Sequence, residues 1–569
     1  MRNERIDGGE AIVQALRDLR IEYVVSSPGS DWGPVWEALA RQQERGDAGP
    51  VYLNCPHELL AVDVALGYTA MTGKMQAVLL HAGVGLLQGS MGINGARVGE
   101  IPMLVMSGES TSFGDREGFD PGPQWYHNHN VAGGLTTYVR PFVKWAQQAG
   151  AAEHLYEIVL RAGEIAMAAP AGPAYLDVPL ESMVAPWRKP PRTRVVPPPP
   201  KLDATPADLD AAARTLLSAK DPLVIAGSPG RTSDGYDALV ELAESLALPV
   251  VEAASSEIGS FPTAHPLHQG FDAGARLATA DVVLVVRSRA PWYPPARGAE
   301  RAHVIVVDEV PFRTHMAYQN LAASALLAGD VTATLRKLAA ALRSAAAADP
   351  AIGRRVADRR ARLAEAHGIA ATRRRSEVED ARAQSGIAPA ALAAAIADAM
   401  PESSIYVDET TSHLRHNRRH LPYRGAQSYH ALRAGLGQGL GYALGVKLAT
   451  PDRPVVALLG DGAFLYNPTL SCLGFSRDRR LPLLIVVYDN RGYRAMRDSQ
   501  LLFYPDGVAR DARCLGEPIS GFDYERAAAL FGGTGIRVDT YDALGPALRE
   551  AVAAVNGGRT AIVNVRVNE

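Results

Sequence analysis

Two short apolar runs near the end of the chain, PVVALL and LLIVVY, each stop at an oxygen-bearing side chain. Asp461 follows the first run and Asn490 follows the second. In parallel α/β sheets, ligands bind at the carboxyl ends of strands, where loops and helix N-termini offer unpaired N–H groups. The glycines beside Asp461 let a phosphate approach the backbone, and a carboxylate facing a phosphate requires a hard cation such as Mg²⁺ between them. These side chains therefore predict a magnesium-held phosphate.

The spacing of the two positions carries more information than either motif alone. A lone GDG triplet is commonly only a tight turn. Here the triplet is followed by 26 residues and then by Asp489 and Asn490. This arrangement resembles the signature of thiamin-diphosphate-dependent enzymes, in which Asp489 stands at the place of the first asparagine. The resemblance implies magnesium ligands at Asp461, Asn490 and the main-chain carbonyl of Gly492. It further implies cofactor contacts at the residues around them: Gly460, Gly462, Ala463 and Tyr493.

A second motif lies about four hundred residues upstream. The segment HELLAVDVALGYTAMTG, residues 57–73, resembles the pattern that carries the activating glutamate in the decarboxylase and acetolactate-synthase group. On its own, Glu58 is an ordinary charge near a helix start, where the helix dipole favours it. The resemblance implies that Glu58 hydrogen-bonds N1′ of the aminopyrimidine and drives it to the imino tautomer, whose nitrogen removes the C2 proton. A buried carboxyl has a raised pKa and can share a proton with a ring nitrogen.

Further cofactor contacts follow from the same resemblance. Leu436, within AGLGQGLGYALG, aligns with the bulky hydrophobe beneath the thiazolium ring that keeps the cofactor bent. Thr411 and Ser412 follow the apolar run IYVDE and align with small polar residues that contact the diphosphate. Without the family, Leu436 reads as a core residue, and hydroxyls after a strand are as often helix caps.

The N-terminal segment resembles the benzoylformate-decarboxylase branch of this group. Ser30, in SSPGSDWG, and His81, in VLLHAG, fall on the positions of that branch's serine and histidine. A histidine at the mouth of a strand titrates near neutrality and can move protons to and from a reacting group. The resemblance therefore adds Ser30 and His81 to Glu58 as candidate catalytic residues, although a lone histidine is more often structural.

The match to benzoylformate decarboxylase is incomplete around the expected substrate pocket. That enzyme has a second histidine in its middle domain, whereas residues 287–295 of this chain contain none, which leaves His127 and His129 as candidates to compensate. His430, Arg433 and Ser499 replace mostly apolar or aromatic residues of the branch, and Gln88 stands where the family usually has asparagine. The candidate substrate-pocket residues are His430, Arg433, Gln88 and His127. Arg433 and Arg497 would make the pocket more cationic than one built for a phenyl ring, so we expect a polar or anionic substrate. Alternatively, either arginine turns outward or binds the diphosphate.

The strands that must position these residues are recognised in the sequence as short apolar runs. Nine runs bounded by Gly, Asp or Ser and spaced by helix-sized segments suggest buried parallel strands. A proline-rich linker at 186–200 and an Ala/Arg/Glu-rich helical linker within 351–386 divide them. We expect an α/β protein of three consecutive doubly wound parallel-sheet domains. The family resemblance implies that these are pyrimidine-binding, central and diphosphate-binding domains, at residues 1–185, 201–345 and 386–569.

Composition excludes several other classes of protein. The 569 residues include 58 basic and 61 acidic side chains without a basic tract, so no nucleic acid or membrane surface is expected as a partner. Cys55, Cys472 and Cys514 are far apart and odd in number, which predicts core positions and neither a disulfide framework nor a metal site. The charged N-terminus and the lack of a long apolar run predict a cytoplasmic protein with a small-molecule substrate.

The expected activity is cleavage or formation of the bond beside a carbonyl. The first candidate reaction is decarboxylation of a 2-oxo acid through a carbanion/enamine intermediate. The alternatives are a carboligase of the acetolactate-synthase or benzaldehyde-lyase type, a hydrolase of cyclic 1,2-diones, or a non-catalytic cofactor-binding homologue. The resemblance implies active sites shared between subunits, with Glu58 from one chain and Asp461 and Asn490 from its partner. A homodimer is then the minimum and a homotetramer is common. FAD or ADP in the central domain stays open, since no nucleotide fingerprint supports it.

Overall fold

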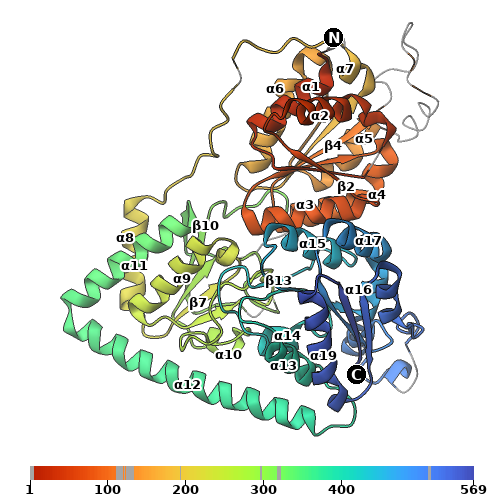
Figure 1. Ribbon diagram of the computed structural model, residues 1–569. Helices are drawn as coiled ribbons and strands as arrows, with labels where there is room; N and C mark the ends of the chain where they lie inside the picture. Colours follow the sequence, from red (N-terminus) through yellow and green to blue (C-terminus); the bar gives the residue numbers. More distant parts are fainter. Residues whose placement is uncertain are drawn as a thin grey trace. The chain divides into compact units, whose positions relative to one another are not determined.

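The chain folds around three parallel β-sheets (Figure 1). The computed structural model describes residues 6–27, 29–109, 120, 122, 133–192, 194–294, 298–316, 322–510 and 514–568. Two compact units divide the chain. The first contains the N-terminal sheet and consists of Met1–Pro200, Ala434–Pro451 and Leu465–Leu481. The second contains the central and C-terminal sheets and consists of Lys201–Arg433, Asp452–Phe464 and Pro482–Glu569.

The N-terminal sheet has the strand order β2-β1-β3-β4-β6-β5, and all of its neighbouring strands are parallel. Its strands are β1 (Tyr23–Ser26), β2 (Val51–Asn54), β3 (Gln76–Leu80), β4 (Met103–Glu109), β5 (Trp145–Gln148) and β6 (Pro173–Pro179). Its helices are α1 (Gly8–Asp18), α2 (Gly33–Arg45), α3 (Glu58–Thr72), α4 (Ala82–Gly99), α5 (Gly134–Val139), α6 (Ala152–Met167) and α7 (Leu180–Val184). Because β3 and β4 are fully buried, they read in the sequence as continuous apolar runs.

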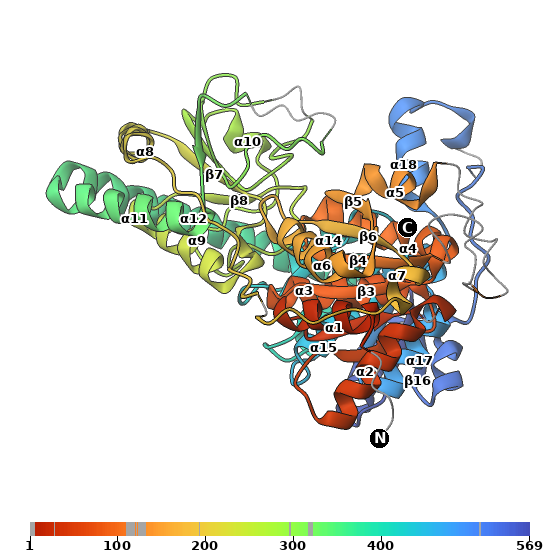
Figure 2. The same ribbon diagram turned by 90° about the horizontal axis from the view of Figure 1, so that it is seen from above.

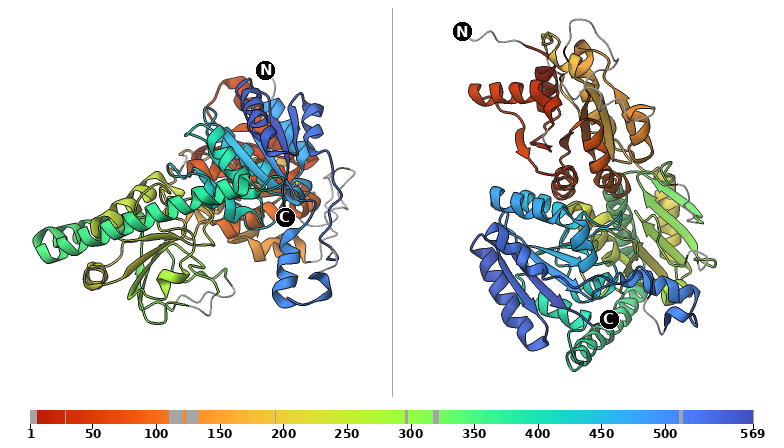
Figure 3. Two further views of the ribbon diagram at one scale, coloured as in Figure 1. Left: turned by 90° about the horizontal axis from the view of Figure 1, so that it is seen from below. Right: turned by 90° about the vertical axis from the view of Figure 1, so that its right-hand side faces the viewer.

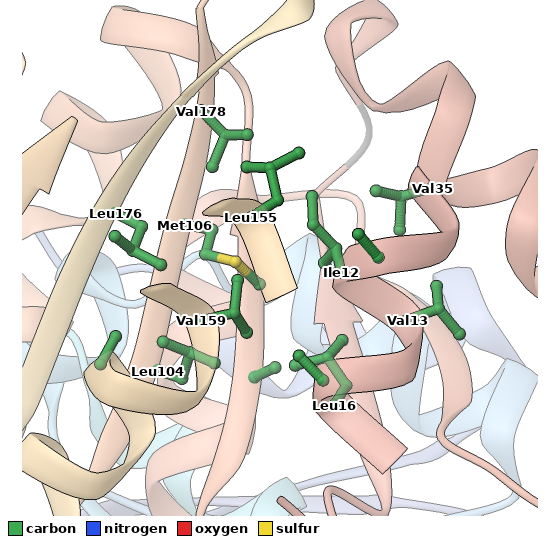
Figure 4. Packing of buried hydrophobic residues seen from close by; sticks show 14 of the residues in the cluster. Ile12, Val13, Leu16, Val35, Leu104, Met106, Leu155, Val159, Leu176 and Val178 are labelled. Carbon is green, nitrogen blue, oxygen red and sulfur yellow. The ribbon is translucent and has the colours of Figure 1, made fainter. Parts of the chain in front are cut away.

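A single apolar cluster joins one face of this sheet to α1, α2 and α6. Figure 4 shows how side chains of these helices meet those of β4 and β6. The labelled members are Ile12, Val13, Leu16, Val35, Leu104, Met106, Leu155, Val159, Leu176 and Val178. Asp7 caps α1 by accepting a hydrogen bond from the Gly9 N–H at 3.1 Å, which begins the helix one residue after the carboxylate.

Glycines allow α3 to pack unusually close to α15 (Gly439–Ala449), which belongs to the same unit although it lies far along the chain. A Cβ on Gly67 would come within 2.1 Å of the Tyr442 carbonyl oxygen, and one on Gly445 within 2.2 Å of the Val64 carbonyl oxygen. Backbone therefore touches backbone at this crossing. The contact fixes α15, and the loop before it, to the helix that begins at Glu58.

The central sheet of the second unit has the order β11-β10-β9-β7-β8. Its strands are β7 (Pro222–Ala226), β8 (Val250–Glu252), β9 (Val282–Val286), β10 (His303–Asp308) and β11 (Ala325–Ala328). Its helices are α8 (Pro206–Ser218), α9 (Ser233–Leu246), α10 (Gly274–Leu277) and α11 (Val331–Ala348). Separate apolar clusters cover the two faces, with α9 and α11 on one side and α10 on the other (Figure 2).

The long helix α12 (Pro350–Arg382) connects the central sheet to the next one as a single uninterrupted helix (Figure 3). Its arginines reach the ends of neighbouring helices. The Arg359 guanidinium donates to the carbonyl oxygens of Leu246, at the end of α9, and of Ala219, just past α8, at 3.0 and 3.2 Å. Cations are favoured at helix C-termini, where carbonyls lack partners. The helix predicted within 351–386 is therefore confirmed, and part of it also secures the central domain.

The C-terminal sheet repeats the strand order of the N-terminal one. Its order is β13-β12-β14-β15-β17-β16, again with every neighbouring pair parallel. Its strands are β12 (Ile405–Glu409), β13 (Tyr429–Ala431), β14 (Val455–Gly460), β15 (Leu484–Asp489), β16 (Thr534–Val538) and β17 (Ala561–Arg566). The remaining helices of this part of the chain are α13 (Pro389–Ala399), α14 (Leu414–His420), α16 (Asp461–Tyr466), α17 (Thr469–Arg479), α18 (Arg494–Phe503) and α19 (Tyr541–Asn556).

The three-domain α/β prediction is confirmed, and so are all nine predicted strands. The sequence reading missed β2, β5, β6, β8, β11, β13, β16 and β17, most of which are short or lie toward sheet edges. The three cysteines are buried and free, as expected. Within the described residues no helix is long and apolar enough to cross a membrane.

Replacing Gly445 by alanine should destabilise the first unit by about 1–3 kcal/mol, because the new methyl group must push α15 away from α3. The measurement is the calorimetric unfolding temperature of the full chain. Gly368 in α12 provides the matched control, since nothing lies within 4 Å of its missing Cβ. Gly368→Ala should stabilise by about 0.5–1 kcal/mol through helix propensity alone. A Gly445→Ala protein that unfolds at or above the wild-type temperature would contradict the close packing.

Candidate active site

In the N-terminal sheet, three predicted catalytic residues follow three neighbouring strands. Ser30 comes after β1, Glu58 after β2 and His81 directly after β3. Because β1 pairs in parallel with both β2 and β3, the carboxyl ends of all three strands lie at one edge of the sheet. Parallel pairing thus brings together residues that are separated by about fifty positions in the sequence. This edge is where open α/β sheets bind ligands.

Glu58 and His81 lie beside the same glycine of α4. A Cβ on Gly85 would be 3.4 Å from Cγ of Glu58 and 3.2 Å from Cβ of His81. Glu58 is the first residue of α3, whose N-terminus is capped by the His57 side chain accepting from the Leu59 N–H at 3.1 Å. The carboxylate is half-buried, in the position that the helix dipole favours for a negative charge. The sheet edge therefore presents an acid and an imidazole next to each other.

His81 has a carboxylate partner that sequence reasoning did not single out. Its Nδ1 lies 2.5 Å from Oδ1 of Asp31, a buried residue in the turn after β1. The hydrogen bond to Asp31 raises the pKa of His81, and the nearby charge of Glu58 acts in the same direction. The signal in the sequence was the acid immediately after Ser30, which only the fold could connect to His81.

Gln88, a predicted pocket residue, lies one turn beyond Gly85 on α4. Its Nε2 is 3.2 Å from Nε2 of His57, so the exposed amide reaches toward the N-terminus of α3. The structure therefore places Gln88 near Glu58. His127, the other predicted pocket residue of this part of the chain, lies outside the described residues, as does His129.

Leu436 belongs to a glycine-rich loop that is anchored to the same unit. The neighbouring Gly435 and Gly437 have φ angles of 158° and 104°, which only glycine adopts readily. A Cβ on Gly435 would come within 2.8 Å of the Met91 sulfur, so the loop runs tightly against α4. At its end, Nε2 of Gln438 lies 3.3 Å from Oδ1 of Asp63 on α3. The backbone that carries Leu436 is thus packed against α3 and α4 of its own unit.

In the C-terminal sheet, Asp461 and Asn490 follow the adjacent parallel strands β14 and β15. Both side chains are buried, at 2% and 7% exposure. Oδ2 of Asp461 and Oδ1 of Asn490 both accept from the N–H of Gly492, at 3.2 and 3.3 Å. Two hard oxygens therefore converge beside the residue whose carbonyl was predicted as the third ligand.

Burial makes the charge of Asp461 costly in the protein alone. Loss of solvent raises the pKa of Asp461 to about 6, with Asp489 adding a smaller repulsive contribution, against hydrogen bonds from Gly462 and Gly492 that lower it. A divalent cation would offset this cost. Among the described residues no three His, Cys, Asp or Glu side chains cluster as a metal site. One carboxylate, one amide oxygen and one carbonyl suit Mg²⁺, which takes its remaining ligands from phosphate and water.

The residues around Asp461 form a crowded turn. A Cβ on Gly462 would lie 2.4 Å from Cε1 of Tyr493, so only glycine lets this ring approach the start of α16. The N–H of Tyr493 donates to the Glu517 carbonyl oxygen at 2.8 Å, which fixes the backbone next to Gly492. Ala463 is buried and Gly460 is half-buried, so the predicted cofactor loop is largely enclosed.

The departure from the family signature at Asp489 has a local explanation. Oδ1 of Asp489 lies 3.2 Å from Nη1 of Arg566, the residue paired with it on β17. The same oxygen accepts from the Arg491 N–H at 3.2 Å. The extra negative charge relative to asparagine is therefore balanced by Arg566 and does not point to a lost metal site.

Thr411 and Ser412 lie in the turn after β12, next to a buried carboxylate. Asp408 accepts hydrogen bonds from the N–H and Oγ1 of Thr410, from Nδ2 of Asn417 and from the Tyr429 hydroxyl, at 2.7–2.8 Å. This network holds the turn, and Thr411 adopts a left-handed φ of 50° within it. Thr411 is exposed and Ser412 is half-exposed, so their hydroxyls are available to a ligand. No sequence pattern singled out Asp408, which is only one of several acids after apolar runs.

The predicted substrate residues of the C-terminal part differ in their exposure to solvent. His430 is 1% exposed in β13, and its Nε2 lies 3.0 Å from the Gln427 carbonyl oxygen. Burial lowers the pKa of His430 to about 4, so it is a neutral core residue and we do not carry it forward as a substrate contact. Arg433 is exposed, whereas Arg497 lies 3.8 Å from the Glu517 carboxylate, which offsets its charge.

Family models for the three domains of thiamine pyrophosphate enzymes match the chain in order. The N-terminal TPP-binding domain matches residues 6–124, the central domain 209–338 and the C-terminal TPP-binding domain 409–565. The chain belongs to the thiamine pyrophosphate enzyme family. It is therefore an enzyme that depends on this cofactor, in the acetolactate-synthase and benzoylformate-decarboxylase group.

Curated relatives of this thiamine pyrophosphate enzyme match over nearly their full lengths. Acetolactate synthase large subunit of Haemophilus influenzae is 24% identical over 100% of this chain and 95% of the relative. Benzoylformate decarboxylase of Pseudomonas aeruginosa is 27% identical over 96% of each chain. A solved structure, the thiamine diphosphate-dependent 4-hydroxybenzoylformate decarboxylase of Rhodococcus jostii RHA1, superposes with a TM-score of 0.78 at 24% identity and covers 99% of both chains. The solved structure supports the fold alone.

Asp461→Asn should stabilise the cofactor-free enzyme at pH 8, because it removes a buried charge. The native pKa of about 6 lies above the ordinary value of 3.8, so the native protein loses stability as the pH rises through this interval. The increase in the free energy of unfolding should reach about 3 kcal/mol at most above pH 6, and it should become smaller toward pH 5. Thermal unfolding at the two pH values measures it. The exposed Asp452 provides the control, and equal behaviour of Asp461→Asn and Asp452→Asn would show that Asp461 carries no such cost.

Proposed function

We propose that the enzyme decarboxylates a 2-oxo acid that is polar or carries a second negative charge. The observation that carries the proposal is the placement of His81 beside Glu58, on either side of Gly85. Glu58 supplies the acid that cofactor activation needs. Decarboxylation also requires a proton to be delivered to the carbon that loses CO₂, and an imidazole that titrates near neutrality can deliver it.

The residues of the chain have separate tasks in this reaction. Asp461, Asn490 and the Gly492 carbonyl would bind Mg²⁺ and through it the diphosphate, and Thr411 and Ser412 would hydrogen-bond the same group. When bound, thiamin diphosphate supplies the electron sink for cleavage of the bond beside the carbonyl.

On the pyrimidine side, Glu58 would hold a proton at N1′ of the aminopyrimidine. Leu436 would support the cofactor's thiazolium ring from a loop that packs closely against Met91 of α4. Ser30 follows β1 at the same sheet edge and would orient the substrate carboxylate.

A polar substrate is proposed from the charges that remain exposed. Arg433 follows β13 and is open to solvent, so it is available to a second anionic or polar group. Arg497 contributes less, because Glu517 lies 3.8 Å from it. A relative named probable 2-ketoarginine decarboxylase, from Pseudomonas aeruginosa, is 26% identical over 87% of this chain, so polar oxo acids occur among the substrates named for the group.

A carboligase is the second candidate. Two of the most similar curated relatives are acetolactate synthase subunits, each matched over 95% of its length. The activation residues would be the same, and only the partner that intercepts the activated substrate would differ: a proton, an aldehyde, or water in a cyclic 1,2-dione hydrolase. Measuring CO₂ release from a panel of 2-oxo acids, with and without an acceptor aldehyde, separates these reactions. Preference for plain aromatic oxo acids would defeat the polar-substrate proposal, and no turnover at all would indicate a non-catalytic homologue.

A homodimer is the smallest proposed assembly, and a homotetramer is the larger one that the resemblance implies. Exposed apolar side chains support association: Val84, Leu87 and Met91 form a stripe on α4 with exposures of 56%, 44% and 41%. The domain boundaries 1–185, 201–345 and 386–569, and a cytoplasmic location, are part of the same proposal. FAD or ADP is not included, since no observation on the central domain favours it.

Glu58→Gln should reduce turnover by at least about a hundredfold, because an amide cannot hold the proton at N1′. Cofactor binding, measured by the rise in unfolding temperature on adding thiamin diphosphate and Mg²⁺, should be largely kept. Glu153, an exposed acid in the first turn of α6, provides the control, and Glu153→Gln should match the wild type in both measurements. Turnover by Glu58→Gln equal to that of the wild type would overturn the mechanism.

Mixing two inactive variants tests whether active sites are shared between subunits. If Glu58 of one chain serves the cofactor held by Asp461 of its partner, a heterodimer of Glu58→Gln and Asp461→Ala contains one intact site and one doubly altered site. Refolding or co-expressing the two together should restore activity to as much as half of the wild-type value per heterodimer. Mixtures that stay as inactive as their components, although heterodimers are detected by mass, would show that each chain supplies its whole site.

A further inference from the structure

The reaction as described does not explain why the partly exposed His81 is hydrogen-bonded to the buried Asp31. Nδ1 of His81 lies 2.5 Å from Oδ1 of Asp31, and the other carboxylate oxygen lies 3.4 Å from the Ala82 N–H, to which it is aligned as an acceptor. Asp31 is 6% exposed, whereas the His81 side chain keeps 27% of its surface. One side of the imidazole is therefore anchored in the protein and the ring is open on another side.

Two glycines allow the backbone to lie very close to the side chains of Asp31 and His81. A Cβ on Gly108, in β4, would be 1.8 Å from Oδ2 of Asp31. A Cβ on Gly29 would be 2.5 Å from Oδ1 of Asp31 and 2.6 Å from Nδ1 of His81. Any side chain at either position would force the two groups apart. The contact therefore depends on two glycines from different elements, which a chance surface ion pair does not require.

We propose that Asp31 is the positioning residue of His81: it accepts the Nδ1 hydrogen, so that Nε2 is the nitrogen presented to the substrate. This assignment rests on the proposed function and deepens it, because Nε2 has a chemical role only if a substrate binds beside His81. Asp31 touches neither cofactor nor substrate in the proposal and acts only through the imidazole.

Two consequences for the chemistry follow from this arrangement. A carboxylate at Nδ1 fixes which tautomer the neutral ring adopts, as in other carboxylate–imidazole pairs. It also favours the protonated ring, so that His81 can hold the proton that decarboxylation consumes. The charged groups that act on His81 are Asp31, from the turn after β1, and Glu58, from α3; both are negative and both favour the cation.

The test measures His81 directly in the cofactor-free full-length protein by NMR titration of the imidazole, with the signal assigned by its loss in His81→Gln. Asp31→Asn keeps the shape of the side chain but removes its charge, so the proton affinity of His81 should fall at least tenfold, which lowers its titration midpoint by one pH unit or more. The ¹⁵N shifts above that midpoint should show the hydrogen on Nδ1 in the wild type and a mixture of tautomers in Asp31→Asn.

Two controls separate positioning from a structural effect. Asp18→Asn removes another carboxylate of the same unit, one that accepts from the Tyr156 hydroxyl at 2.7 Å, and should leave the His81 titration unchanged. The exposed His154 on α6 is an internal reference whose titration should not move in either variant. If Asp31→Asn fails to fold, Gly108→Ala provides a second test, because its methyl group displaces Asp31 without removing the charge and should also lower the His81 midpoint.

The outcome is independent of whether the substrate has been identified. A His81 midpoint and tautomer that are unchanged in folded Asp31→Asn would overturn the proposal, whatever the activity. A lowered midpoint in an enzyme that turns over no 2-oxo acid would retain the Asp31 assignment and reject the proposed function. Where activity is present, the pH profile of kcat in Asp31→Asn should shift to lower pH by the same amount as the His81 titration.

Discussion

The main constraint on the functional residues is the free-energy cost of placing charged side chains at the buried carboxyl edge of a parallel sheet. Buried strands force the chain to emerge where backbone N–H groups are available but water is scarce, so each ionisable side chain there needs a specific partner. Asp408 has four hydrogen-bond donors, Asp489 has Arg566, and Asp31 has His81. Asp461 accepts hydrogen bonds from three backbone N–H groups, those of Gly462, Gly492 and Arg491, and burial raises its pKa to about 6. Unlike the other three, Asp461 is bound by no described side chain, and it is the acid for which we propose a cation.

The same topology produces both groups of functional residues. The first and last sheets share one strand order; the residues of interest follow β1 and its neighbours β2 and β3 in the first sheet, and β12, its neighbour β14 and the next strand β15 in the last. In the N-terminal sheet those residues are Ser30, Glu58 and His81; in the C-terminal sheet they are Thr411, Asp461 and Asn490. The two edges also differ in the types of side chain that they carry. One edge carries an acid and a base suited to moving protons, and the other carries oxygen ligands suited to a metal-held phosphate.

The sequence predicted those features that depend on local pattern. Runs such as VVALL and LIVVY identify strands because both faces of a parallel sheet are buried, and the residue after each run is then known to lie at the sheet edge. Short edge strands such as β2 and β13 escaped this reading because only part of each is buried or because they span few residues. The burial of His430 was missed for the same reason: without β13 in the prediction, nothing showed that this residue belongs to a buried strand.

What the sequence could not supply is the pairing of residues across elements. Asp31 and His81 are fifty positions apart, and their contact exists only because β1 and β3 are neighbours and because Gly29 and Gly108 leave room. In the sequence, Asp489 is a departure from the family motif without an evident partner, whereas in the structure Arg566 lies opposite it on β17. In both cases the role of a carboxylate becomes clear only from a partner that an adjacent strand brings to it. Departures from a family motif at such an edge therefore have to be judged together with the residue that balances their charge, because burial makes an unbalanced substitution too costly to persist.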